Sequence, residues 1–246
     1  MALDVRDIAA AATRSIQQLE MVTQNIAHAN TPGFKAIHLS YALQSDPVSG
    51  TTDPGLEYAP YGLTDFSPGT LQRTGGALDV AIEGDGFLAV ETKQGTAYIR
   101  GGSLHINKNS ELVTSTGERV LGTSGPITID GNDVQIGQDG TISVTEPGGD
   151  GTISTNVGQL KVVTFDRPQN LKKQGDNQYI DPGTAGMTVM TDPRVQGQTL
   201  EMSNVNAIKE MVAMIELQRS FETYQKIIRT MTDQDKQSTS QIGRVV

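Results

Sequence analysis

The chain lacks several residue types, and each absence narrows what the protein can be. None of its 246 residues is cysteine, so disulfides and thiolate metal sites are excluded. It has no tryptophan, and aromatic residues make up only 4% of the chain. No apolar run approaches the ~20 residues that a helix needs to cross a bilayer. A formal net charge of −9 argues against general nucleic-acid binding, which needs a basic face to neutralise phosphates.

The amino terminus also lacks the features of a secretory signal. Its first residues, MALDVRDIAAAATRS, contain Asp4, Arg6 and Asp7 and no continuous apolar core. We therefore expect no cleaved signal peptide. This pattern fits a cytoplasmic protein, and it equally fits a protein that a dedicated route exports by reading an uncleaved amino terminus.

Acidic charge is concentrated in the middle of the chain. Residues 1–30 carry two basic and three acidic side chains, and residues 200–246 carry six of each. Residues 31–199 carry 11 basic and 19 acidic side chains, a balance of −8. The nearly neutral ends can pack against copies of themselves without strong like-charge repulsion.

The first 30 residues have the apolar spacing of one long helix. Small and apolar side chains recur at alternating intervals of three and four, which is a heptad pattern typical of helices that pack side by side. They are Val5, Ile8, Ala12, Ser15, Leu19, Val22, Ile26 and Ala29. The helix is predicted to stop at Asn30-Thr31-Pro32-Gly33, because proline cannot continue it and pushes the preceding residue toward an extended conformation. The pattern alone equally fits an amphipathic helix that lies on the protein's own core.

A second long helix is predicted from 205 to 234, with an N-cap at Ser203-Asn204. Two apolar stripes follow each other along it and differ in phase. The first stripe is Val205, Ile208, Val212 and Ile215, and the second is Met214, Leu217, Phe221, Tyr224, Ile228 and Met231. Polar residues follow, so the last turns are expected to fray.

The middle of the chain is predicted to be all-β. Turn sequences such as Ser67-Pro68-Gly69 and Asp181-Pro182-Gly183 separate short β-prone stretches such as LDVAIE (78–83) and LKVVTF (160–165). Residues 34–66 show no clean period and are expected to form an irregular connector. The predicted fold class is α+β: helices at 1–33 and 203–246 pair as a discontinuous, coiled-coil-like assembly domain, and 67–202 form a central β domain of many short strands.

Two long helices alone would leave much of each apolar stripe uncovered. An acidic β region is a poor place to bury them, so we expect further helices to come from other copies of the chain. The sequence therefore predicts a polymer subunit that displays a β domain outside a helical core. The predicted assembly interface comprises Val5, Ile8, Ala12, Leu19, Val22, Asn25, Ile26, Val205, Ile208, Val212, Ile215, Leu217, Phe221, Tyr224 and Ile228.

No motif indicates catalysis, a cofactor or a metal. GDGFLA (84–89) matches G-x-G-x-x-A, but strand-like residues follow it where a dinucleotide-binding turn must open a helix, so a hairpin with a tight turn or bulge is the better interpretation. The stretches DGND (130–133) and GGDGTI (148–153) depart from calcium-binding loops and are expected to form turns. His28, His38 and His105 have no metal-ligand spacing. We expect most carboxylates to be solvated.

Three stretches together resemble the bacterial flagellar rod and hook protein family. They are QNIAHANTPGFK (24–35), LDVAIEGDGFLAV (78–90), and EMSNVN through LQRSFE (201–222), in the family's order. The length and DFSPGTLQRTGGALDVAIEGDGF (65–87) are most similar to the FlgF-type proximal rod protein, with the distal, FlgG-type rod protein second. His28 and Gly101 depart from the residues usual in the family. The resemblance marks Asn30, Thr31, Pro32, Gly33 and Phe34 as the turn of the family motif.

The resemblance implies a structural subunit of the basal-body driveshaft that transmits motor torque. Such a subunit would be exported unfolded by the flagellar type III apparatus without a cleaved signal. It would then assemble in the periplasm with itself and other rod proteins into a helical tube, with the terminal helices inside and the β domain outside. No cofactor, nucleic acid or small-molecule substrate is implied. The alternatives are a distal rod or hook-type subunit, an oligomeric adhesin or carbohydrate-binding module, and an acidic periplasmic enzyme.

Overall fold

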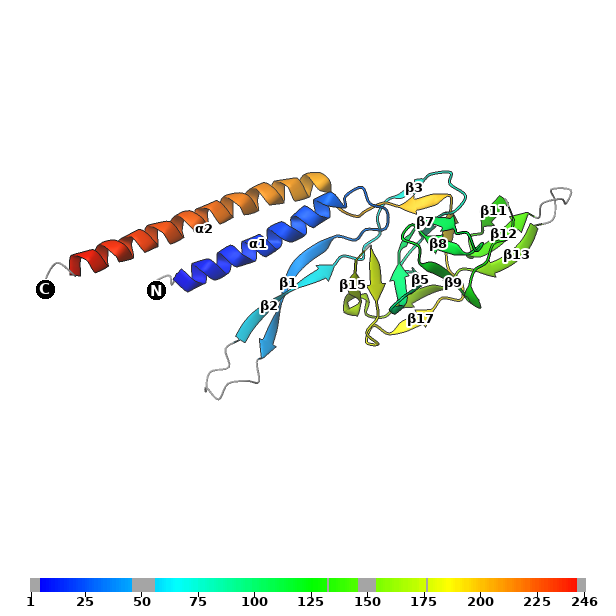
Figure 1. Ribbon diagram of the computed structural model, residues 1–246, viewed down its shortest axis with the longest axis horizontal. Helices are drawn as coiled ribbons and strands as arrows, with labels where there is room; N and C mark the ends of the chain where they lie inside the picture. The colour runs from blue at the N-terminus through cyan, green and yellow to red at the C-terminus, as the bar shows by residue number, and fades with distance from the viewer. Residues whose placement is uncertain (1–4, 46–55, 132, 146–153, 176, 243–246) are drawn as a thin grey trace. The chain divides into compact units, whose positions relative to one another are not determined.

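The computed structural model describes residues 5–45, 56–131, 133–145, 154–175 and 177–242. The chain divides into two compact units (Figure 1). The terminal unit contains residues 1–27, 37–63 and 206–246, and the β unit contains 28–36 and 64–205. The GGDGTI stretch, and Asn132 within DGND, lie outside the described residues.

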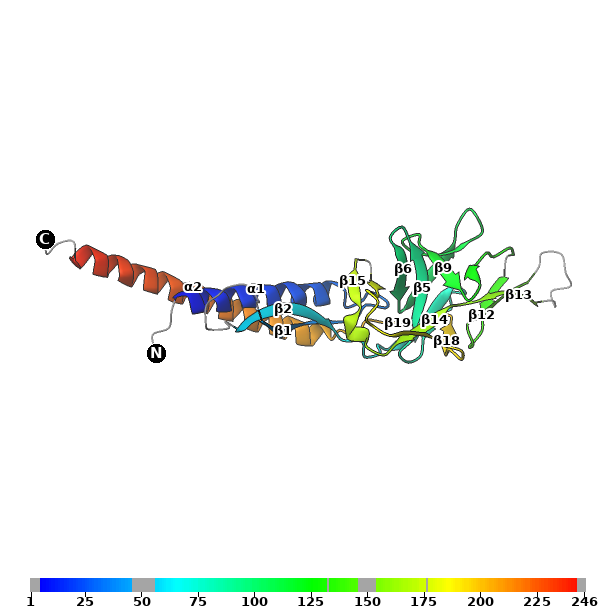
Figure 2. The same ribbon diagram turned by 90° about the horizontal axis from the view of Figure 1, so that it is seen from below.

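Two helices and a two-stranded ribbon form the terminal unit. Helix α1 spans Val5–Ala27 and helix α2 spans Ala207–Ile242, roughly 35 Å and 54 Å at 1.5 Å per residue. Strands β1 (Ile37–Ser45) and β2 (Leu56–Thr64) pair with each other. Figure 1 and Figure 2 both show the helices side by side with the ribbon along α1. No helix that the described residues form is long and apolar enough to span a membrane.

The ribbon corrects two predictions. A coiled-coil-like terminal domain is wrong, because the unit is a helix pair joined by a β-ribbon and not two helices along a shared heptad seam. The irregular connector at 34–66 is also wrong, because it holds two nine-residue strands. The stretch IHLSY (37–41) alternates apolar and polar residues as a strand does, a signal that the prediction missed, whereas YAPYG (58–62) contains a proline and a glycine and does not alternate.

Both helices have ends that differ from those predicted. Helix α1 stops at Ala27, three residues before Asn30. The N-cap of α2 is Asn206, whose Oδ1 accepts a hydrogen bond from Lys209 N at 3.1 Å. Asn204 has another role, described below. Helix α2 continues to Ile242, past the predicted end at 234.

Short strands form the β unit. They are β3 (Leu71–Arg73), β4 (Asp79–Ile82), β5 (Phe87–Thr92), β6 (Gly95–Ile99), β7 (Gly101–Ile106), β8 (Leu112–Thr114), β9 (Arg119–Gly122), β10 (Gly125–Pro126), β11 (Asp133–Ile136), β12 (Thr141–Thr145), β13 (Ser154–Gln159), β14 (Val162–Phe165), β15 (Lys172–Gln174), β16 (Gln178–Ile180), β17 (Met187–Val189), β18 (Val195–Gly197) and β19 (Thr199–Glu201), with a 3-10 turn at Pro168–Asn170. The main sheet runs β15-β16-β6-β5-β9-β8-β7-β4-β18, and β10 and β14-β17 branch from it. Strands β11-β12-β13 form a second sheet, and β3-β19 a third.

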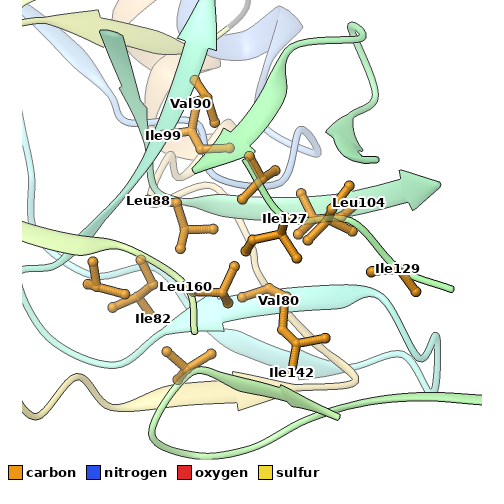
Figure 3. Close-up of a cluster of buried hydrophobic side chains, with 14 of the residues drawn as sticks. Val80, Ile82, Leu88, Val90, Ile99, Leu104, Ile127, Ile129, Ile142 and Leu160 are labelled. Atoms are coloured by element: carbon orange, nitrogen blue, oxygen red, sulfur yellow. The ribbon is translucent and has the colours of Figure 1, made fainter. Parts of the chain in front are cut away.

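Strand β5 lies between two hydrophobic clusters. Leu88 and Val90 point into the larger cluster, whereas Phe87 and Ala89 point into the smaller, aromatic one. Because both faces of β5 are covered, its residues form a continuous apolar run instead of an alternating pattern. Figure 3 shows the larger cluster, where Leu88 and Val90 lie among side chains from other strands, such as Leu104 and Ile142.

The glycine turn at 84–86 joins two strands that do not form a hairpin with each other. Strand β4 pairs with β7 and β18, whereas β5 pairs with β6, β9 and β14. The predicted hairpin is therefore wrong, although a strand does follow the glycines. Gly84 has a φ of +94°, a conformation that favours glycine. The turn carries the chain from one part of the sheet to another, which two nearby strand-like stretches cannot reveal.

Candidate functional site

Helix α1 turns its predicted stripe inward only in part. Ile8, Ala12 and Ser15 are buried, and Leu19, Val22 and Ile26 are half-buried. Val5 begins the helix, but its side chain lies outside the described residues. Small residues on the stripe allow a second helix to approach closely, and α2 packs along α1 within this unit.

Helix α2 has two different apolar faces. The later stripe, Leu217, Phe221, Tyr224 and Ile228, is half-buried in the terminal unit. The earlier stripe is bare: Ile208 is 77% exposed, Val212 52% and Ile215 48%. Met211, which the sequence analysis did not include, lies on the same face and is 48% exposed. Val205 precedes the helix and is half-buried in the β unit.

Asn25 binds the backbone of its own chain. Its Oδ1 accepts a hydrogen bond from Ile37 N at 2.9 Å, and its Nδ2 donates to Ile37 O at 3.0 Å. The side chain is only 1% exposed and pairs with Ile37 as a neighbouring strand would. The prediction that Asn25 contacts other subunits is therefore corrected: its amide fixes the start of β1 against α1.

The family-motif turn is built into the β unit. Thr31 N donates to His28 O at 3.0 Å, and Gly33 N donates to Glu201 O at 2.7 Å. Gly33 has a φ of +71°, which a residue with a Cβ adopts only with strain. Phe34 is fully buried, while Asn30 at the tip is exposed. The turn thus ties the segment that follows α1 to the segment that precedes α2.

Three buried charged side chains, Lys35, Arg100 and Glu201, form a cluster next to this turn, which we call the junction. Lys35 Nζ lies 2.6 Å from Glu201 Oε1, and Arg100 Nη2 lies 3.2 Å from Glu201 Oε2. All three side chains are 2% exposed or less. Lys35 also donates to Ser67 O at 2.7 Å, and Gly69 N donates to Glu201 Oε1 at 2.8 Å. Burial lowers the pKa of Lys35, although its hydrogen bond to Glu201 favours the charged form.

Arg100 links this junction to the glycine turn. Its guanidinium donates to Gly86 O at 2.5 Å and to Gly84 O at 2.6 Å, and it lies 5.2 Å from the centre of the Phe87 ring. The turn that superficially matches a dinucleotide-binding motif therefore presents carbonyl oxygens to an arginine instead of N–H groups to a phosphate. Gly84 and Gly86 thus provide two backbone acceptors for the buried Arg100 side chain.

Asn204 closes the junction from the carboxyl-terminal side. Its Oδ1 accepts a hydrogen bond from Ala36 N at 2.8 Å, and its Nδ2 donates to Asp65 O at 2.9 Å. Asn204 therefore holds two segments that are distant in sequence instead of capping α2. These hydrogen bonds join three points of the chain: the residue before β1, the residue after β2 and the segment before α2.

A stacked column covers the outer side of the turn. The His28 ring stacks on Phe34 with centroids 4.7 Å apart, and Lys173 Nζ lies 4.1 Å from the centre of the Phe34 ring. His28, which departs from the usual family residue, thus has a defined packing role. The Lys173 amine is buried and has no hydrogen-bond partner among the described residues. Burial lowers the pKa of Lys173 from 10.5 to about 8 and raises that of Tyr179 in the same unit.

The depressed pKa of Lys173 predicts a stability change in alkali. Between pH 8 and 10.5 the unfolded chain binds more protons at this residue than the folded chain, so the free energy of unfolding should rise with pH across this window. After allowance for partial exposure we expect about 1–2 kcal/mol. Urea unfolding near both ends of the window should show a larger rise in the wild type than in Lys173→Met, in which only buried groups such as Lys35 still contribute. Identical pH profiles would contradict the assignment.

The charged members of the junction were missed by sequence reasoning. Lys35 and Glu201 were quoted only as letters of the family motifs, and carboxylates were expected to be solvated. A usable signal existed, since Lys35 directly follows an apolar Phe and Arg100 ends the apolar stretch AYI. The sequence around these residues does not show which carboxylate pairs with them. Glu201, the partner of Lys35, lies 166 positions further along the chain.

Two observations bear on binding or catalysis. Within the described residues, no group of three or more His, Cys, Asp or Glu side chains is arranged to hold a metal. A cleft of about 790 Å³ in the β unit is lined by polar residues such as Arg73, Glu83 and Arg194, and no aromatic residue is among the described residues that line it.

Known proteins match this chain along most of its length. Residues 81–144 match the flagellar hook protein FlgE/F/G D1 domain, and residues 196–242 match the flagellar basal body rod FlgEFG protein C-terminal domain. The flagellar basal-body rod protein FlgF of Escherichia coli is 36% identical, with 91% of each chain covered. FlgF of Salmonella typhimurium is 34% identical over 94% of each chain. FlgG of Bacillus subtilis is 32% identical over 87% of this chain and 89% of its own.

Proposed function

Because this chain belongs to the family of flagellar basal-body rod proteins, we propose that it is a structural subunit of the rod, of the proximal FlgF type. The observation that carries the mechanism is the bare apolar face of α2, where Ile208, Val212 and Ile215 are each at least 48% exposed. An aliphatic side chain gains about 1.5–3 kcal/mol when it is fully buried. Such an exposed apolar face favours burial in an assembly.

The proposed mechanism is mechanical. The terminal helices carry the contacts between subunits, and torque passes through many such contacts in parallel. Within the β unit, the buried Lys35–Glu201–Arg100 junction joins the segment that follows α1 to the segment that precedes α2, so load that passes along the chain from either helix reaches the same set of strands. Because the proposed contacts between subunits are distributed along both terminal helices, they suit a protein whose role is structural and not catalytic.

The proposal extends to partners and location. The subunit assembles with other rod and hook proteins in the basal body, a setting that the names of its relatives support. It self-associates in a periplasmic helical tube after export by the flagellar type III apparatus without signal cleavage. The family resemblance supports these finer points. The carbohydrate-binding and enzymatic alternatives gain no support from the cleft of the β unit, whose described lining residues include no aromatic side chain.

Fractionation of basal bodies tests the proposed function. A strain that carries an epitope-tagged copy in place of its own gene should swim, and purified basal bodies should contain the tagged chain. Deleting the gene should abolish swimming, and the tagged copy should restore it. Basal bodies without the chain, from cells that swim normally, would reject the proposal.

A further inference from the structure

The cleft of about 790 Å³ in the β unit is bordered by residues of several strands. Its lining includes Leu71 and Arg73 of β3, Ile136 of β11, Val195 of β18, and Arg194, which immediately precedes β18. The volume lies within the range of about 300–1,000 Å³ that is usual for ligand pockets. The cleft is therefore large enough for a ligand or a short segment of another chain.

Two arginines give the cleft a local positive charge in an acidic part of the chain. Residues 31–199 have a formal balance of −8, yet Arg73 and Arg194 are both exposed at the cleft. Arg73 Nη2 donates to Gln198 Oε1 at 3.4 Å, and the Arg194 side chain has no hydrogen-bond or ion-pair partner among the described residues. Both guanidinium groups can therefore bind carboxylates.

Glu83 is the one acidic residue among the described residues that line the cleft. Its Oε2 accepts a hydrogen bond from Gln196 Nε2 at 3.3 Å, and it forms no ion pair with a described arginine. Asp139 and Asp192 lie close to lining residues in the sequence, but neither is among the described lining residues, and Asp139 is held by Thr141. Two arginines and one glutamate leave the described lining with a net charge of +1.

Strand β3 has a free edge beside these arginines. Among the described strands, β19 is the only one that pairs with β3. Thr70 O and Thr74 N form hydrogen bonds toward the β19 side. Because backbone groups alternate between the two edges of an antiparallel strand, Leu71 and Arg73 direct their N–H and C=O groups to the other edge. Such an edge is a template for pairing with another chain.

The free edge and the cleft act on the same ligand, because Leu71 and Arg73 present their side chains on one face of β3 and both line the cleft. A strand added along this edge places alternate side chains on that face. We propose that β3 and the cleft bind an extended acidic segment of a partner protein by strand addition. The backbone of Leu71 and Arg73 bonds the segment, and Arg73 and Arg194 bind its carboxylates.

The backbone edge favours a peptide over a small anion. A free phosphate can use the arginines, but only a polypeptide also supplies N–H and C=O groups that recur at the strand spacing of about 3.4 Å per residue. Charge favours an acidic segment over a basic one. This inference goes beyond the proposed function, because it concerns the β unit and not the contacts of the terminal helices.

Fluorescence anisotropy with a labelled peptide tests the site on the full-length chain. The probe is fluorescein-Gly-Glu-Thr-Glu-Thr-Glu-Gly, and the control probe carries glutamine in place of each glutamate. We expect the acidic probe to bind about tenfold or more tightly than the control probe, and to weaken as salt is raised. The double variant Arg73→Gln/Arg194→Gln should remove most of this difference. Arg167→Gln, at an exposed arginine that is not among the described lining residues, should leave it unchanged.

A second pair of variants tests strand addition. Leu71→Pro removes the N–H group on the free edge and leaves the bonds to β19 in place. Leu71→Ala keeps this N–H group and shortens the same side chain. The acidic probe should bind severalfold more weakly to Leu71→Pro than to Leu71→Ala. Thermal unfolding checks that each variant is folded.

The other outcomes overturn the inference. Equal binding of the two probes, no binding of the acidic probe, or an equal loss in Arg167→Gln would reject the site. Competition by inorganic phosphate as strong as that by unlabelled peptide would show a small-anion site, and equal affinities of Leu71→Pro and Leu71→Ala would show that no strand is added. Sedimentation in which the peptide separates two copies of the chain would show that the occupant is a second copy. All of these results leave the proposed rod function to be decided by fractionation of basal bodies.

Discussion

Replacing Glu201 with glutamine is expected to lower the free energy of unfolding of the β unit by about 3–5 kcal/mol. Glu201 is the shared acceptor for Lys35 and Arg100, and all three side chains are nearly inaccessible to water. The amide is close in size but carries no charge, so two buried cations would lose their counter-ion. Small domains are stable by only about 5–15 kcal/mol, so the loss would be a large part of the total.

Glu91→Gln is the matched control for this experiment. Glu91 pairs with Arg119 at 2.9 Å, but both side chains are more than 40% exposed. Exposed pairs contribute about 0–1 kcal/mol, so the control should change stability little. Urea unfolding of both variants, followed by circular dichroism, gives the two values. A Glu201→Gln loss no larger than that of Glu91→Gln would contradict the buried-junction account.

Replacing Phe221 with aspartate is expected to abolish rod assembly and swimming while the β unit remains folded. Phe221 is half-buried on the face of α2 that packs along α1, and a carboxylate there would lose its hydration without gaining a partner. Leu19→Asp should act in the same way from the α1 side. Swimming assays and blots of basal bodies measure assembly, and thermal unfolding of the purified chain reports on the β unit.

Gln225→Asp is the control for this pair because it adds the same side chain at an exposed position of α2. It should leave swimming and incorporation unchanged. Wild-type swimming in both Phe221→Asp and Leu19→Asp would show that the helix pair is not needed for assembly. Loss of β-unit folding in Phe221→Asp would show that the effect is global and would remove its support for the account.

The sequence predicted what depends on local pattern. Heptad spacing located both helices. Ile8 and Ala12 recur along one face of α1, and Leu217 and Phe221 recur along one face of α2. The same spacing did not show that a β-ribbon accompanies the helices, because a helix stripe carries no information about which element covers it. The coiled-coil prediction failed for that reason.

The junction depends on distant residues and was beyond local pattern. Asn204 has the residue type and position of an N-cap. Its side-chain amide instead forms hydrogen bonds with Ala36 N and with Asp65 O. Asn206 fulfils the cap two residues later. Either asparagine satisfies the capping rule, and only the tertiary structure decides between them. Family resemblance marked the right stretches, but it did not state that Lys35 and Glu201 meet.

The central claim is that the bare face of α2 is covered only when subunits assemble. Labelling of a Val212→Cys variant with a water-soluble maleimide measures this directly, because no other thiol is present. The account predicts rapid labelling of the dilute purified chain and strong protection of the same residue in intact basal bodies, with labelling restored after the rod is dissociated. Equally rapid labelling of the chain in intact basal bodies would contradict it.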